Sequence, residues 1–294
     1  MTGITGVYFD LDDTLCTYWE AARAGLREAF ALHAPDSTEA LVKHWAAAFL
    51  ELLPQIRTDR WYPVYLKSGE EPRTEVIRGA FHRLGVKDEE LIRRVSHAYM
   101  TLRNQKLELF SDAIEVLSKL KQSYPLGLIT NGPADIQRME IDRLQIESYF
   151  DQIFIEGELG FGKPDPEVFV RAAQAMNKRP AELVFIGNSY EHDIRPAIEA
   201  GWKTIWVRRE SDVPPSSIGF AVPKGQQELG LSDAAPEGRP EHSRGCNPRN
   251  ETPPSGSPER GETTAPESLP PSAPAPDAEI HDLKELLTFL PPLS

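Results

Sequence analysis

The stretch "VYFDLDDTLCTYW", residues 7–19, passes from apolar side chains into three aspartates and then into aromatic residues. Its first half is almost continuously apolar, which is typical of a strand in a sheet that is covered on both faces. Buried carboxylates are costly and neighbouring ones repel each other, so the cluster predicts a special role at the strand end. Side chains two apart on a strand point the same way. We therefore expect Asp10 and Asp12 to face one side, and Asp13 to point away in a structural role.

Composition limits the classes of protein that this chain can belong to. Its 294 residues are 40% hydrophobic, which suffices for one large or two modest domains. The net charge of -13 and the lack of a run of Lys and Arg argue against a nucleic-acid partner. Cys16 and Cys246 give no disulfide framework, and no apolar stretch approaches the ~20 residues that span a bilayer. Without a secretory leader at its start, the chain is expected to be a soluble cytoplasmic protein with no membrane partner.

Residues 16–108 have only the apolar spacing of helices. Three apolar faces recur at helical spacing: Leu41, Trp45, Ala48, Phe49 and Leu52; Ile77, Phe81 and Leu84; and Leu91, Val95, Ala98 and Leu102. Thr74 and Asp88 are expected to begin helices as N-caps, and Gly85 is expected to end one. This part of the chain is therefore predicted to form a bundle of roughly four helices.

From about residue 109 short apolar runs alternate with helical segments. With the first strand, the predicted strands cover residues 5–12, 124–132, 151–159, 182–189 and 202–207. Helical segments span 134–144 and 166–176, the second opened by Asp165 and Pro166. The alternation predicts an α/β fold with a doubly wound, Rossmann-like parallel sheet. Ligands bind at the carboxyl ends of such strands, where "DLDDT", "TNG" and "GNS" fall.

The predicted sheet is interrupted by residues 213–275, which are rich in Pro, Ser, Gly and Glu. Such a composition cannot bury enough apolar surface to fold, so we expect a disordered insertion. We favour a tolerated surface loop over a proline-rich ligand for a partner domain. A short strand and an amphipathic helix follow from Asp277, with these apolar residues on one side: Leu283, Leu286, Leu287 and Leu290. The predicted domains are a core of residues 1–15, 109–212 and 276–294, and an inserted α-helical cap of residues 16–108.

Four motifs in this order resemble those of the haloacid dehalogenase-like superfamily. They are "FDLDDT" with Asp10, Asp12 and Thr14, "LITNG" with Thr130, "GKPDPEVF" with Lys163, and "IGNSYEHDI" with Asp193. The resemblance covers the whole chain except the insertion, and the helices between the first two motifs match the helical cap of that family. Four motifs in order are far more specific than a single D-x-D-x-T.

The resemblance implies a Mg²⁺-dependent phosphatase of small phosphorylated metabolites. Asp10 would attack phosphorus and form an aspartyl phosphate, and Asp12 would protonate the leaving oxygen and later activate water. The residues themselves agree, because one of two neighbouring carboxylates can stay ionised while the other keeps a proton. Mg²⁺ suits hard oxygen ligands and a transferring phosphoryl group.

The other motifs are expected to bind the phosphoryl group. The hydroxyl of Thr130 and the backbone amides of Asn131 and Gly132 can hold phosphoryl oxygens. Lys163 would place a compact positive charge near both Asp10 and the phosphate.

The predicted metal ligands are Asp10, Asp12, Asn188 and Asp193. Asn188 stands where the family usually has an acidic residue, and an amide oxygen brings no charge, so we expect a weaker metal site that depends more on Asp193. The alternative is that Asn188 only caps the turn. We expect His192 to lie on the surface or behind the ligands.

The leaving group and the oligomeric state are not predicted, although residues of the cap should select the substrate. The candidates are Tyr18, Trp19, Arg23, Arg60, Trp61 and Lys67. Two other functions remain open. A dehalogenase of this superfamily needs neither a second acid nor a metal, so Asp12 argues against it. A non-catalytic binding protein would explain Asn188 as a sign of weakened chemistry.

Overall fold

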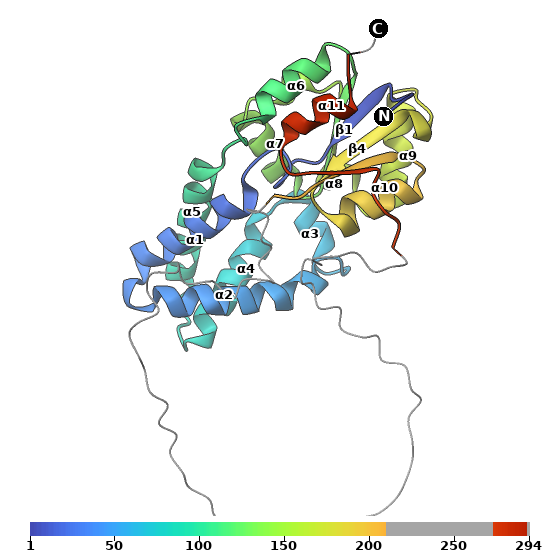
Figure 1. The fold of residues 1–294 in the computed structure, drawn as a ribbon. Helices are drawn as coiled ribbons and strands as arrows, with labels where there is room; N and C mark the ends of the chain where they lie inside the picture. The colour runs from blue at the N-terminus through green and yellow to red at the C-terminus, as the bar shows by residue number, and fades with distance from the viewer. Residues whose placement is uncertain (210–272, 293–294) are drawn as a thin grey trace, which may run out of the picture.

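The computed structural model describes residues 1–209 and 273–292, and its centre is a parallel sheet of six strands in the order β3-β2-β1-β4-β5-β6 (Figure 1). The strands are β1 (Gly6–Phe9), β2 (Leu126–Thr130), β3 (Gln152–Ile155), β4 (Leu183–Gly187), β5 (Lys203–Val207) and β6 (Ala278–Ile280). This arrangement confirms the predicted doubly wound α/β fold. Most of the predicted insertion, residues 213–272, lies outside the described residues.

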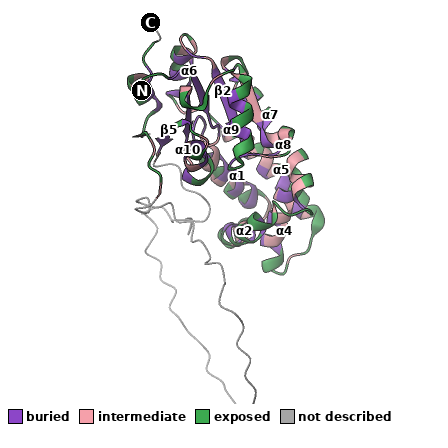
Figure 2. Cartoon of the chain, turned by 90° about the vertical axis from the view of Figure 1, so that its right-hand side faces the viewer, coloured by how far each residue is buried: buried purple, intermediate pink, exposed green. Residues whose placement is uncertain are grey.

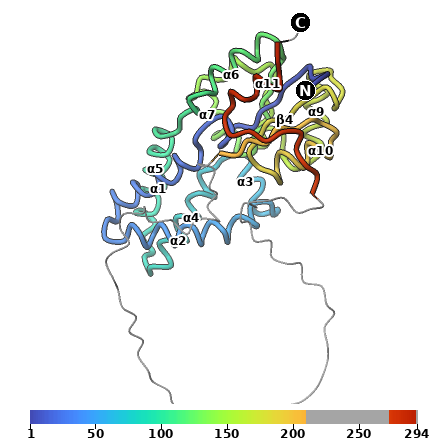
Figure 3. Tube along the Cα trace, in the orientation of Figure 1, coloured from blue at the N-terminus to red at the C-terminus, as the bar shows by residue number. Residues whose placement is uncertain are grey.

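Helices cover both faces of the sheet. One face packs against α6 (Ala113–Lys121), α7 (Ala134–Arg143) and α11 (Leu286–Phe289), and the other against α9 (Pro166–Ala175) and α10 (Arg195–Glu199). Buried residues concentrate in the strands and on the helix surfaces that face them (Figure 2). Of the four leucines predicted to share one side, Leu283, Leu286 and Leu290 are buried in this core, whereas Leu287 is only partly buried against it. The N-terminal amine donates a 2.7 Å hydrogen bond to the carbonyl oxygen of Phe289, which joins the two ends of the described chain (Figure 3).

Five further helices lie beyond the carboxyl ends of the strands, at one end of the molecule (Figures 1 and 3). They are α1 (Tyr18–His33), α2 (Thr38–Leu52), α3 (Tyr62–Lys67), α4 (Glu70–Arg83) and α5 (Glu89–Lys106). Their apolar residues form a cluster of their own, which contains Leu41, Trp45, Ile77 and Val95 from the predicted faces. Leu84 is 36% exposed, because α4 ends at Arg83 before the predicted face is complete.

Short helical turns complete the chain. They are η1 (Pro35–Ser37), η2 (Leu53–Gln55), η3 (Glu147–Tyr149), α8 (Glu156–Leu159), η4 (Pro180–Glu182), η5 (Tyr190–Ile194) and η7 (Leu283–Glu285). None of the helices within the described ranges is long and apolar enough to cross a membrane. Cys16 is a buried free thiol, and Cys246 lies outside the described residues.

Three of the predicted helix boundaries are confirmed and one is wrong. The carboxylate of Asp88 accepts hydrogen bonds from two amides at the start of α5, and that of Asp165 accepts one from the amide of Glu167 at the start of α9. Gly85 has φ of 76° just after α4, a conformation that favours glycine. Thr74 is not an N-cap, because α4 already begins at Glu70. Its hydroxyl lies 2.7 Å from that of Ser96, so it joins α4 to α5 instead.

The ring of Tyr8 requires a glycine on the neighbouring strand. A Cβ on Gly127 would lie 2.0 Å from Cε1 of Tyr8, far closer than atoms can pack. The Tyr8 hydroxyl donates a 2.7 Å hydrogen bond to the carbonyl oxygen of Ala172 in α9. Gly127 therefore leaves room for a side chain that joins β1 to α9.

The Gly127→Ala substitution is expected to lower the free energy of unfolding by about 1–3 kcal/mol, because the added methyl group overpacks the core. Urea unfolding followed by circular dichroism measures the change. The same substitution in a Tyr8→Ala background should cost much less. Equal losses in the two backgrounds would show that the ring is not the cause.

Candidate active site

A cavity of about 410 Å³ lies at the carboxyl ends of β1, β2 and β4. The strand order reverses between β1 and β4, which is where ligands bind in doubly wound sheets. Asp10 and Asp12 follow β1, Asn131 follows β2 and Asn188 follows β4, and all four line the cavity. The prediction that three strands direct their polar ends to one place is therefore confirmed.

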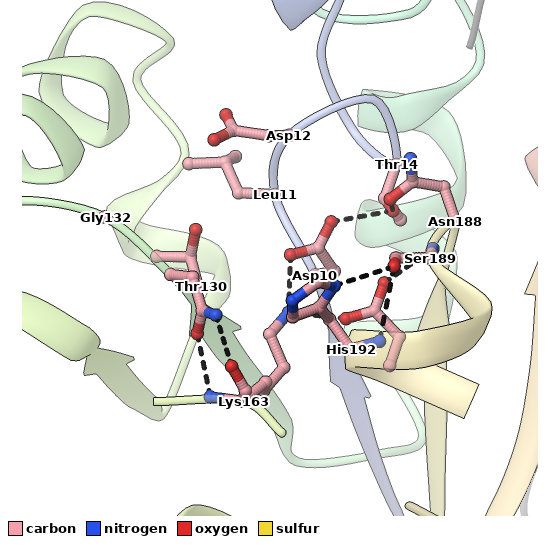
Figure 4. A network of polar contacts seen from close by, with 12 residues as sticks. Asp10, Leu11, Asp12, Thr14, Thr130, Gly132, Lys163, Asn188, Ser189 and His192 are labelled. Carbon is pink, nitrogen blue, oxygen red and sulfur yellow. Dashed lines mark hydrogen bonds and ion pairs between the residues drawn. The ribbon is translucent and has the colours of Figure 1, made fainter. Parts of the chain in front are cut away.

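Lys163 is the central charge of the site. Its Nζ lies 2.6 Å from Oδ1 of Asp10 and 2.7 Å from Oδ1 of Asp193, and the residue is only 1% exposed (Figure 4). The second oxygen of Asp193 accepts a 2.9 Å hydrogen bond from the amide of Ser189. Burial raises the pKa of Asp10 to about 6, although Lys163 opposes this change. One ammonium group thus compensates two buried carboxylates that follow different strands, β1 and β4.

Two oxygens beside this ion pair approach the same hydroxyl group. Oγ1 of Thr14 donates to Oδ2 of Asp10 over 2.9 Å and lies 3.3 Å from Oδ1 of Asn188. Carboxylate and amide oxygens are ligands of the type that Mg²⁺ prefers, so the donor atoms beside Thr14 agree in kind with the predicted metal site.

Asp193, another predicted metal ligand, has hydrogen-bond partners for both of its carboxylate oxygens. Both carboxylate oxygens of Asp193 are bonded, one to Lys163 and one to Ser189. Among residues 1–209 and 273–292, no group of three or more His, Cys, Asp and Glu side chains is placed to hold an ion. The ligand roles of Asp10, Asp12, Asn188 and Asp193 therefore all stay predictions.

Asp12 lies apart from Asp10 and points to the other side of Leu11 (Figure 4). The prediction that Asp10 and Asp12 face the same side is therefore wrong. The alternation of strand side chains does not extend to Asp12, because β1 ends at Phe9 and the backbone turns after Asp10. Oδ2 of Asp12 accepts a 3.3 Å hydrogen bond from the side chain of Gln137. Burial, and then the nearby carboxylates of Glu140 and Asp10, raise the pKa of Asp12 well above its usual value. Asp12 can therefore keep a proton that Asp10 loses.

The turn that follows is held by Asp13, which has φ of 57° and is 3% exposed. Its Oδ1 accepts a 3.1 Å hydrogen bond from the amide of Trp19 at the start of α1. This contact agrees with the structural role that the sequence predicts for Asp13, but the expectation that Asp13 points away from the site is wrong, because Asp13 also lines the cavity.

Behind Asp12, a buried network connects the sheet to α5. Gln137 accepts a 2.7 Å hydrogen bond from the Thr130 hydroxyl and donates one of 3.1 Å to Glu140. Glu140 forms a buried ion pair with Arg103 of α5, whose guanidinium lies 4.6 Å from the ring centroid of Tyr18. Thr130 is 1% exposed and its hydroxyl is bonded within the protein, so its role toward phosphate stays a prediction.

The turn after β2 is also bonded within the protein. The side-chain amide of Asn131 donates to the carbonyl oxygen of Lys163 over 2.6 Å and accepts from its backbone amide over 2.9 Å. The backbone amide of Gly132 donates a 3.1 Å hydrogen bond to Oε2 of Glu156. Asn131 thus positions Lys163, and phosphate binding by Asn131 and Gly132 remains a prediction.

Glu156 joins this turn to the segment before α3. Its side chain is fully buried, and Oε1 lies 2.8 Å from Nη2 of Arg57. The same oxygen accepts a 3.0 Å hydrogen bond from the Tyr62 hydroxyl. Burial raises the pKa of Glu156, while the charge of Arg57 opposes this change. Together with the pair between Arg103 and Glu140, this contact fixes the distal helices to the sheet at two points.

Sequence reasoning missed these connecting residues. Gln137 and Glu140 share a helical face with Ile141, and all three are buried. Polar residues on an apolar helical face could have indicated the first network. No sequence signal indicates Glu156 or Arg57, because their contact joins segments that are far apart in the chain.

Of the six candidates for substrate selection, Tyr18 and Trp19 line the cavity. The other four do not line it: Arg23, Arg60, Trp61 and Lys67. His192 lines the cavity from an exposed position, with Nδ1 3.2 Å from the Ser189 hydroxyl. Several lining residues from the distal helices were not predicted as site residues: Trp45, Phe49, Tyr65, Arg73, Val76 and Tyr99.

Comparisons with known proteins find a matching hydrolase family and similar phosphatases. The model of a family described as haloacid dehalogenase-like hydrolase matches residues 4–201. The chain is 28% identical over 231 residues to N-acylneuraminate-9-phosphatase of Rattus norvegicus, covering 74% of this chain and 88% of that protein. It is 29% identical over 222 residues to phosphoserine phosphatase of Thermus thermophilus, covering 68% and 87% of the two chains.

Solved structures share the fold. The putative HAD-hydrolase YfnB of Bacillus subtilis, bound to magnesium, has a TM-score of 0.60 and 17% identity, covering 98% of this chain and 99% of that one. A 2-haloacid dehalogenase of Pseudomonas syringae has a TM-score of 0.55 and 24% identity, covering 98% of each chain. At these identities the likeness concerns the fold alone.

The Lys163→Met substitution is expected to lower the free energy of unfolding by about 3–5 kcal/mol, because it leaves two buried carboxylates without their cation. Urea unfolding at pH 7 measures this loss. As a control, Lys119→Met removes an exposed pair with Glu115 and should cost less than about 1 kcal/mol. Similar losses in the two variants would contradict the role assigned to Lys163.

Proposed function

Because the chain belongs to the haloacid dehalogenase-like hydrolases, we propose that it hydrolyses small phosphomonoesters with Mg²⁺ through an aspartyl phosphate on Asp10. The observation that supports this most strongly is the pair of unlike carboxylates in one cavity. Asp10 lies beside the ammonium of Lys163, whereas Asp12 lies among acidic neighbours that favour its protonated form. The phosphatases among the similar proteins support a phosphoric monoester as substrate.

The proposed reaction has two steps that balance in protons. In the first, a carboxylate oxygen of Asp10 bonds to phosphorus, the bond to the leaving oxygen breaks, and Asp12 gives that oxygen its proton. In the second, Asp12 takes a proton from water, and the resulting hydroxide attacks phosphorus and releases phosphate from Asp10. General acid–base catalysis of this kind contributes about 10²- to 10⁴-fold to the rate.

The acidic site needs positive charge to accept a phosphate dianion. Lys163 supplies one charge, and Mg²⁺ held by Asp10 and Asn188 would supply the rest by polarising the phosphoryl group. The uncharged oxygen of Asn188 leads us to expect weaker metal binding than a carboxylate would give. Asp12 and Asp193 remain the other proposed ligands.

We also propose that α1–α5 form a cap domain over the core. Their separate apolar cluster supports this division, and so does their contribution of one side of the cavity wall. The contacts of Glu156 with Arg57 and of Glu140 with Arg103 would then hold the cap against the core. A cap in this position would exclude water and admit only small substrates, such as phosphorylated metabolites.

Phosphate release from p-nitrophenyl phosphate tests the proposal. We expect turnover that requires Mg²⁺, falls to background in Asp10→Asn, and falls by about 10²- to 10⁴-fold in Asp12→Asn. The Asp142→Asn variant is a matched control, because this exposed residue lies on the outer side of α7.

The other two functions give different results in the same experiment. Chloride release from 2-chloropropionate without phosphate release would identify a dehalogenase. Absence of both activities in folded protein with added Mg²⁺ would favour a binding protein. Equal phosphatase activity in wild type and Asp10→Asn would refute the proposed nucleophile.

A further inference from the structure

The cavity contains an arginine that no feature of the proposed reaction uses. Arg73 lies on α4 and lines the cavity, and nothing within the described ranges forms a hydrogen bond or ion pair with its guanidinium. Its Nη2 lies 2.7 Å from the position that a Cβ on Gly69 would take, so the group packs tightly against the chain. Burial lowers the pKa of Arg73. The side chain of Arg73 is partly buried, and a partly desolvated cation without an acidic partner destabilises the free protein, which indicates that a ligand supplies the partner.

Asp135 is the acidic residue whose charge acts on Arg73, and its carboxylate already has other hydrogen-bond partners. The carboxylate of Asp135 accepts a 2.8 Å hydrogen bond from the Ser68 hydroxyl and others from the amides of Gly69 and Ile136. Asp135 thus holds the start of α4 against α7. The guanidinium remains available to a group that enters the cavity.

Other hydrogen-bond donors in the same cavity also lack partners. Tyr18, Tyr65 and Tyr99 line it, and no hydrogen bond joins their hydroxyls to any residue in the part of the chain that the structure describes. Burial raises the pKa of Tyr65 and of Tyr99, so both stay protonated donors at neutral pH. The buried Nε1 of Trp45, another lining residue, has no partner either.

The two sides of the cavity therefore differ in their chemistry. The strand ends carry the carboxylates of Asp10 and Asp12, whereas the distal helices contribute a cation and neutral donors. Aromatic side chains, among them Trp19 and Phe49, line the space between. A substrate with its phosphate at Asp10 would present its leaving group to the donor side.

We propose that the leaving group of the substrate carries a carboxylate, which binds Arg73 and accepts hydrogen bonds from the tyrosine hydroxyls. This inference rests on the proposed phosphatase function and names its substrate class: phosphomonoesters of hydroxy acids. The planar guanidinium matches a carboxylate in a bidentate pair. A single negative charge also matches the single arginine. A second phosphate would bring more charge into a cavity that already contains several carboxylates. A neutral leaving group would leave the partly buried guanidinium of Arg73 without a charged partner.

Two matched pairs of substrates test this inference. 6-Phosphogluconate differs from glucitol 6-phosphate, and 4-carboxyphenyl phosphate from phenyl phosphate, chiefly in the carboxylate. The two pairs differ in length and shape, so preference for the acid in either pair supports the inference. We expect kcat/KM to favour the acid by about 10- to 100-fold, the range for a hydrogen-bonded charge pair. No preference in either pair would overturn the inference.

Variants of Arg73 identify the residue responsible. Arg73→Met keeps the length of the side chain without its charge and should reduce the acid-to-neutral ratio of kcat/KM by about 10- to 100-fold. Arg73→Lys should retain part of the preference. Arg78→Met is the control on the same helix, because Arg78 pairs with Glu75 and Glu89 and does not line the cavity. An unchanged ratio in Arg73→Met would contradict the proposed role.

Two measurements do not depend on turnover. The melting temperature of Arg73→Met should equal or exceed that of wild type, since an unpaired cation is removed; a large decrease would indicate a structural role for Arg73. In EDTA, calorimetry should show tighter binding of 6-phosphogluconate than of glucitol 6-phosphate to wild type but not to Arg73→Met. If no ester is hydrolysed, the proposed function fails and calorimetry still decides whether Arg73 binds carboxylates.

Discussion

The contact of one buried ammonium group with two carboxylates is the interaction on which the site depends. Lys163 lies between Asp10 at the end of β1 and Asp193 in the turn after β4, and Asn131 after β2 holds its backbone. Three strand ends are thus tied to one residue. Without this charge, the parallel strands would bring acidic groups together at their carboxyl ends with nothing to offset their repulsion.

Much of the fold could be predicted because its signals are local. The apolar run before Asp10 and the alternation of strands and helices indicate a parallel sheet directly, and Asp88 begins a helix for a reason visible in its neighbours. The side chain of Thr74 is also of a type that caps helices, yet its hydroxyl forms a hydrogen bond with the hydroxyl of Ser96 on another helix. The sequence alone contains no information on which distant residue will compete for such a group.

The residues of the site also fall into two groups: those that a local motif indicates, and those that depend on contacts between distant segments. Asp10, Asp12 and Lys163 belong to motifs, and the structure brings all three to one cavity. The contact between Glu156 and Arg57 could not be predicted, because it joins segments about 100 residues apart through packing of whole helices. Arg73 is of the same kind. Its charge is ordinary in the sequence, and only its place in the cavity wall without an acidic partner makes it a candidate for binding.

The outer edge of the sheet has a consequence for how the chain can vary in length. Val207 of β5 and Ile280 of β6 are register partners, so neighbouring strands are joined by a connection of more than 60 residues. Pairing at the edge sets where both ends of that connection lie. Related chains can therefore gain or lose long segments between β5 and β6 while the catalytic end of the sheet keeps its geometry.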